Sequence, residues 1–142
     1  MTPVSRLLSQ YVYGRLFEWV MTLNMTLLGL LCVVYPEALQ VSAFRYMIFI
    51  GDPKWFGILC IAVGYARFAA LVINGRSMVW GPQTRAACAV IGAMIWFQML
   101  TALVAYSITT GYPSPGVSNW LSLCLGELLA AYLAGRDVRR SS

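Results

Sequence analysis

Four apolar stretches dominate this chain, and each is long enough to cross a membrane as a helix. A bilayer core requires roughly 17–25 consecutive apolar residues in helical form. In lipid, a helix bonds its own backbone polar groups, which leaves few other solutions for such a segment. The sequence therefore predicts an all-α integral membrane protein, a four-helix bundle in one domain (1–142), with spans at 17–35, 55–73, 86–108 and 117–134.

Composition supports this class and excludes several functions. Hydrophobic residues make up 60% of the chain and charged residues 11%, against about 45–50% and 25% in soluble domains. There is no histidine, the usual general base and the commonest metal ligand. We find no metal-ligand cluster, phosphate loop or serine nucleophile motif. We therefore predict no enzyme activity, no cofactor and no metal site.

The cysteines and the basic residues give two further expectations. One cysteine falls in each span, and none forms a CxxC pair, so we expect buried, inert thiols at Cys32, Cys60, Cys88 and Cys124. The net charge is +5, but the basic residues are scattered rather than clustered. Nucleic acid is therefore not an expected partner, and the lipid bilayer is.

Residues that start or stop helices flank the predicted spans. The first span ends at Pro36. Gly111 marks the end of the third span. The other expected caps are Asp52-Pro53 and Asn74-Gly75 around the second span, and Ser118 and Gly135 around the fourth.

The connections between the spans differ in character. The first, PEALQVSAFRYMIFIGD, is too interrupted to span, and we predict an interfacial helix over about 37–50, lying in the membrane interface or over the bundle mouth. An irregular apolar loop is the alternative. The second connection, NGRSMVWGPQTR, is a short basic loop, and the third, TTGYPSPG, is a tight uncharged turn.

The basic residues near the span ends set the expected orientation. Lysine and arginine accumulate on the cytoplasmic side of membrane proteins. Seven arginines fall on one side of the predicted bundle: Arg6, Arg15, Arg76, Arg85, Arg136, Arg139 and Arg140. The other side has only Arg45 and Lys54, offset by Glu37 and Asp52. Both termini are therefore predicted to be cytoplasmic.

Arg67 and Glu127 are the two charged residues deepest within the spans. At about 1.5 Å per residue, they lie roughly 10 Å and 12 Å from the cytoplasmic ends of the second and fourth spans. These spans run in the same direction, so the two residues share a depth. Their side chains start out directed away from the nearer surface. We therefore predict an ion pair inside the bundle, either structural or part of a proton or ion relay; separate contacts with water are the alternative.

The other polar groups of the spans carry weaker expectations. Glu18 starts the first span beside Trp19, and we read it as an interfacial carboxylate that favours a helix N-terminus. Asn24 and Gln98 are expected to form hydrogen bonds between helices.

Small residues recur at four-residue spacing on two spans. The fourth span has Ser118, Ser122, Gly126, Ala130 and Ala134, and the second has Ala62, Ala66 and Ala70. Such stripes allow helices to approach closely. We predict that the second and fourth spans are neighbours through these stripes, unless one stripe faces a second copy of the chain.

Several segments resemble a group of viral membrane proteins. They are RLFEWVMTLNMTLLGLL, SAFRYM, RFAALVINGR, the SPG before the last span, and GELLAAYLAGRDVRR. Together they are similar to small four-span inner-membrane proteins encoded by tailed phages and prophages of proteobacteria. The resemblance implies the host inner membrane and a lysis-related or superinfection-related role, for which holins are one example. It brings no assigned site residues.

Two function classes remain open from the sequence. The first is a non-catalytic membrane protein that acts by helix association, as an accessory subunit, a homo-oligomer or a phage-type effector. The second is a small dimeric transporter or channel that uses Arg67 and Glu127. Four spans and an intramembrane carboxylate resemble the small multidrug-resistance exporters. Their essential glutamate lies well inside the first span, however, whereas Glu18 is at the entrance of this one.

Overall fold

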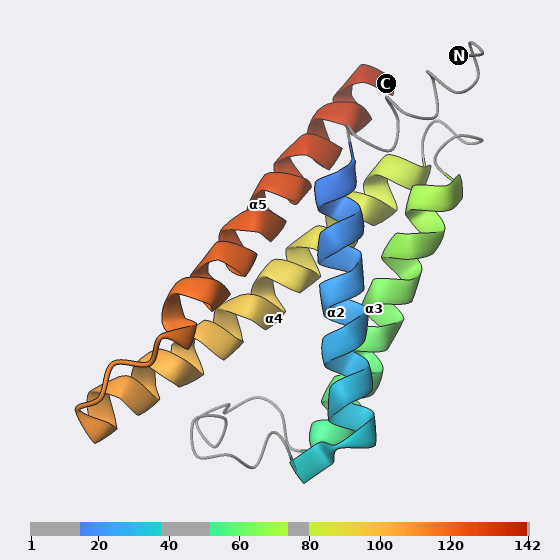
Figure 1. Cartoon of the computed structure of the whole chain (residues 1–142). Coiled ribbons are helices and arrows are strands. Elements are labelled where there is room, and N and C mark those ends of the chain that lie inside the picture. Colours follow the sequence, from blue (N-terminus) through green and yellow to red (C-terminus); the bar gives the residue numbers. More distant parts are fainter. Residues whose placement is uncertain (1–14, 38–51, 74–79, 142) are drawn as a thin grey trace, which may run out of the picture.

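The four predicted spans are present as four long helices. The computed structural model describes residues 15–37, 52–73 and 80–141, without the side chains of the last two. Its helices are α2 (Leu16–Val34), α3 (Pro53–Ile73), α4 (Trp80–Thr110) and α5 (Gly116–Ser141) (Figure 1). Each is long and apolar enough to cross a membrane, so the chain is an all-α, multi-pass membrane protein. The predicted interfacial segment, about 37–50, lies outside the described residues apart from Glu37.

Two of the predicted helix ends are confirmed in detail. The backbone N–H of Lys54 donates to Oδ1 of Asp52 at 2.9 Å, so Asp52 caps α3 and Pro53 is its first residue. Gly111 follows α4 with φ of +73°, and its N–H donates to the Ser107 carbonyl at 3.0 Å. A glycine adopts this left-handed conformation without steric cost, which is why the helix ends here.

Helix α2 ends just before Pro36, as predicted, and the predicted Asn74-Gly75 end lies outside the described residues. Three other predicted boundaries are wrong. Residues 80–85 belong to α4 rather than to the basic loop, which brings Arg85 inside a helix. Ser118 is not a cap, because its hydroxyl donates to the Pro115 carbonyl at 3.1 Å. Helix α5 also continues through Gly135 as far as Ser141. No proline follows Gly135 to stop the helix, and Asp137 in the next turn is held by ion pairs.

The helices form two antiparallel hairpins. The first hairpin is α2 with α3, and the second is α4 with α5; helix α3 also rests on α4, and α5 touches α2 lightly. Figure 1 shows the hairpins close together at the end where α2 begins and α5 ends, and diverging toward the other end. The tight third connection explains why α4 and α5 are neighbours, since short loops favour antiparallel pairs.

The first hairpin is held by close backbone approach. A Cβ added to Gly29 would lie 2.7 Å from the Gly57 carbonyl oxygen, and one added to Gly57 would lie 2.7 Å from the Gly29 oxygen. Farther along α3, a Cβ on Gly64 would overlap the Thr26 hydroxyl. Glycine is thus required at this helix crossing, because any side chain there would push the backbones apart.

The prediction that the second and fourth spans pack on each other is wrong. Helix α5 packs on α4, where a Cβ on Gly92 would lie 2.8 Å from the Glu127 carboxylate. Gly126 of the predicted stripe faces α2, where an added Cβ would lie 2.5 Å from Cζ of Phe17. Ala70, Ala130 and Ala134 are buried, Ala66 is half-buried, and the stripe members left exposed are Ala62, Ser118 and Ser122.

Helix α4 has its own small residues, which explains this pairing. Ala89 and Ala93 are four residues apart and buried, as are Cys88 and Gly92. The Cys124 thiol of α5 lies 3.7 Å from the Ala93 carbonyl oxygen. All four cysteines of the chain are buried and unbonded to one another.

Candidate functional site

The structure brings Arg67 and Glu127 together in the bundle interior. Nη1 of Arg67 donates to Oε2 of Glu127 at 2.5 Å, and the two side chains are 2% and 0% exposed. Their helices, α3 and α5, run in the same direction (Figure 1) but do not pack against each other. The long arginine side chain therefore bridges from one hairpin to the other.

This central pair is incompletely bonded. Among the residues that the structure describes, Nε and Nη2 of Arg67 and Oε1 of Glu127 have no hydrogen-bond partner. The indole N–H of Trp96 lies beside the Glu127 carboxylate and interacts with it, although the two do not reach full hydrogen-bond geometry. Gly92 leaves the space that the carboxylate occupies. The arrangement places one cation and one anion in contact. Arg67 keeps N–H donors, and Glu127 keeps a carboxylate oxygen, that could form further hydrogen bonds.

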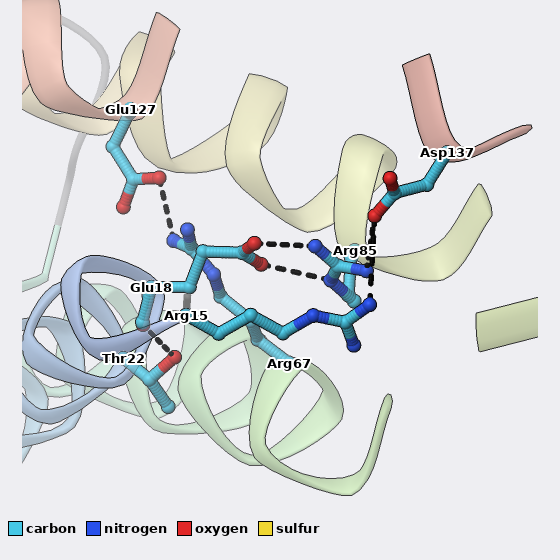
Figure 2. A network of polar contacts seen from close by, with 7 residues as sticks. All are labelled: Arg15, Glu18, Thr22, Arg67, Arg85, Glu127 and Asp137. Atoms are coloured by element: carbon cyan, nitrogen blue, oxygen red, sulfur yellow. Dashed lines mark hydrogen bonds and ion pairs between the residues drawn. The ribbon is translucent and has the colours of Figure 1, made fainter. Parts of the chain in front are cut away.

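A second ion cluster lies at the end of the bundle where α2 begins and α5 ends. Arg85 of α4 forms a bidentate ion pair with Glu18 of α2. Its Nε donates to Oε2 of Glu18 at 2.8 Å, and its Nη2 donates to Oε1. Its Nη1 donates to Oδ2 of Asp137 on α5 at 3.2 Å. Arg15 lies 3.5 Å from the same oxygen (Figure 2). Arg85 is 1% exposed, so it links three helices from inside the bundle.

This terminal cluster, formed by Arg15, Glu18, Arg85 and Asp137, is not among the sequence predictions, which place Glu18 at the membrane interface and Arg85 in a loop. Glu18 was predicted to be an interfacial carboxylate; it does lie in the first turn of α2, but it is buried and forked by Arg85. Arg85 was expected in a loop. Both residues lie near the N-termini of helices that run in the same direction. Arg67 and Glu127 are predicted to pair because they lie at the same depth in helices of the same direction. The same criterion also pairs Glu18 with Arg85.

The ion pairs join the two hairpins. Arg67 and Glu127 connect α3 with α5, Glu18 and Arg85 connect α2 with α4, and Arg15 reaches Asp137 from the start of α2. Within the described residues only Arg85 with Asp137 stays inside one hairpin. The backbones of α2 and α3 are in close contact at their crossing, whereas between the hairpins these ion pairs accompany a shared apolar core.

The two amides of the spans form no bonds between helices in the described part of the chain. Asn24 donates to the carbonyl of Val20 in its own helix at 3.1 Å. The amide nitrogen of Gln98 is buried and without a partner. The expectation of interhelical hydrogen bonds from these residues is wrong within one copy, because each side chain lies at the edge of its helix interface.

The described residues contain no group of three or more histidine, cysteine, aspartate or glutamate side chains arranged to hold a metal ion. The chemistry available to the two clusters is that of carboxylates and guanidinium groups. They can hold charge, exchange partners and bind protons.

Comparison with known proteins adds no assignment. No protein-family model, curated protein or solved structure matches the chain. The site is therefore interpreted from its own geometry.

A double-mutant cycle measures how tightly the central pair is coupled. Arg67→Ala and Glu127→Ala are each expected to destabilise the bundle by about 3 kcal/mol, because each leaves a buried charge unpaired. The double variant should recover at least about 1 kcal/mol of the summed loss. The measurement is reversible unfolding in mixed micelles. Strictly additive losses would show that the two charges do not stabilise each other.

Proposed function

We propose that this chain is a non-catalytic protein of a bacterial inner membrane that acts by association with other transmembrane helices. In this proposal it is a homo-oligomer, an accessory subunit of a larger complex, or a phage-type membrane effector related in role to holins. The end that carries the ion clusters faces the cytoplasm, with both chain termini. The excess of arginines near that end supports this orientation.

The uncovered surface of α5 carries the proposal. Only 28% of the residues in its apolar segment are buried, compared with 50% in α4. Its small-residue stripe is also only half used: Gly126, Ala130 and Ala134 are buried, whereas Ser118 and Ser122 are exposed. Small exposed residues let a further helix come close. The first half of α5 is thus the surface best suited to a helix partner, and we assign it to a second copy of the chain.

Cysteine cross-linking in native membranes tests this assignment. Ser122→Cys is nearly isosteric, and the four natural thiols are buried, so the wild-type background should be low. Mild oxidation of Ser122→Cys is expected to give a disulfide-linked dimer. Thr101→Cys provides a matched control, since Thr101 is a small, exposed hydroxyl residue on α4.

The cross-linking outcomes separate the candidates. A larger adduct from Ser122→Cys would identify a different partner subunit, to be named by copurification in mild detergent. Equal cross-linking at Ser122 and Thr101, or none at either position, would contradict association through α5. For the phage-type role, induced expression should stop growth and admit dye; harmless accumulation at a high level would exclude it.

A transporter or channel is the second candidate, favoured by one observation. The central pair has unbonded polar atoms on both partners, as a site that changes partners during transport would. Glu127→Gln should then abolish flux in proteoliposomes while the fold survives. The adjacent Arg67 would repel a cationic substrate. For this reason we rank a transporter or channel below a protein that acts by helix association.

A further inference from the structure

The two ion clusters lie next to each other. The rings of Trp19 and Phe68 are in edge contact, with centroids 5.5 Å apart, which sets the neighbouring residues Glu18 and Arg67 at the same level of the bundle. In the view of Figure 2 the Arg67 guanidinium overlaps the side chain of Glu18, and Glu18 is one of the charges that act on Glu127. A line of carboxylates thus runs from Asp137, whose side chain is 37% exposed, through Glu18 to the fully buried Glu127.

The two buried arginines are used differently. Arg85 donates hydrogen bonds to Glu18 from the guanidinium edge formed by Nε and Nη2. The same edge of Arg67 has no partner among the described residues, and Oε1 of Glu127 is also open. A buried group left without a hydrogen bond costs free energy, so native structures seldom keep one without a use. Arg67 and Glu127 are thus joined by one hydrogen bond, whereas Arg85 and Glu18 are joined by two.

We propose that Glu127 is a proton-binding site, and that its protonation transfers Arg67 to Glu18. The proton comes from water at the Asp137 end and forms an O–H bond at Oε1 of Glu127. Arg67 keeps its charge and loses its ionic partner. Among the described side chains the Glu18 carboxylate accepts two bonds, both from Arg85, so it has lone pairs left for the open edge of Arg67.

The groups around Glu127 come from every helix of the bundle. They are Arg67 from α3, Cys88 and Trp96 from α4, Cys124 from α5 itself, and Glu18 from α2. Two of these, Arg67 and Glu18, carry charge, and the thiols and the indole are neutral. Burial away from water is the first influence on the proton equilibrium at Glu127, and the two charged residues that exchange partners act on it as well.

Partner exchange would change how the hairpins are joined. The bond from Arg67 to Glu127 connects α3 with α5. Once it is broken, α5 keeps its packing on α4 and its ion pairs at Asp137. Proton binding would thus loosen α5 from the first hairpin while its end stays tied. The exchange takes place within one chain and does not depend on association with a second copy.

Carbon-13 NMR of the glutamate carboxyl groups tests the proposal on the full chain. The sequence has only three glutamates, Glu18, Glu37 and Glu127, and Glu37 is exposed outside the helices. In nanodiscs of phosphatidylethanolamine and phosphatidylglycerol, the Glu127 carbon is expected to titrate to the acid form with the fold intact. The Nε resonance of Arg67 should move with it. A Glu127 carboxylate that stays ionised until the protein unfolds would overturn the proposal.

Variants separate proton binding from partner exchange. Glu127→Gln imitates the protonated form and should show dipolar coupling between Arg67 and the Glu18 carboxyl carbon at every pH. Glu37→Gln is the matched control and should titrate as the wild type does. A Glu127 titration that leaves the Arg67 resonance unmoved contradicts the exchange. If Glu127→Gln does not fold, the wild-type titration still decides between these outcomes.

Discussion

Replacing Arg85 by alanine is expected to destabilise the bundle by roughly 4–5 kcal/mol, near the upper end for breaking a buried ion pair. The loss exceeds that at Arg67 because Arg85 holds two carboxylates. It forms a bidentate ion pair with Glu18, which is 4% exposed, and it also donates a hydrogen bond to Asp137. Glu18 would be left buried and unpaired. Unfolding in mixed micelles, followed by circular dichroism, measures the loss.

Two variants control this prediction. Arg136 is an exposed arginine near the same end of α5, so Arg136→Ala should change stability by no more than about 0.5 kcal/mol. Arg85→Lys keeps the charge but loses the fork, and it should recover only part of the loss. If Arg85→Ala were as mild as Arg136→Ala, the terminal cluster would not stabilise the contact between the hairpins.

Gly57→Leu is expected to prevent the first hairpin from closing, at a cost above about 3 kcal/mol, beyond the usual range for overpacking. The obstacle is backbone rather than a movable side chain. A Cβ at Gly57 would already lie 2.7 Å from the Gly29 oxygen and 2.9 Å from the Cβ of Cys32. Yield of folded protein and unfolding in mixed micelles are the measurements.

Gly135 provides the matched control on α5. A Cβ there would meet nothing within 4 Å. Gly135→Leu should therefore be tolerated, and Gly135→Ala should stabilise α5 by up to about 1 kcal/mol through helix propensity. Gly57→Ala should destabilise instead. The same sign for both alanine variants would mean that the backbones of α2 and α3 are not in close contact at Gly57.

Hydropathy was sufficient for the number, order and approximate bounds of the helices. An apolar segment of spanning length has few other stable forms in lipid, so this inference needs no knowledge of neighbours. Asp52 with Pro53, and Gly111, set helix ends for equally local reasons. Ser118 and Gly135 did not, because a residue that can end a helix does so only where the following residues permit it.

The neighbours of each helix could not be obtained in this way. Stripes of small residues on the second and fourth spans suggested that these helices touch, whereas α5 packs on α4 and α3 on α2. Small residues recur on α4 as well, and the glycines at the α2–α3 crossing occur singly in the sequence. Spacing along one helix shows that a close approach is possible without showing which helix makes it.

The sequence by itself therefore determined a four-helix membrane protein and the contact between Arg67 and Glu127, because length, direction and depth are properties of each helix alone. Tertiary structure decided that these residues belong to opposite hairpins, that Arg85 forks Glu18, and that one edge of Arg67 is left open. Those features depend on how far apart helices lie and how side chains fill the space between them, which is set by the packing of all four helices together.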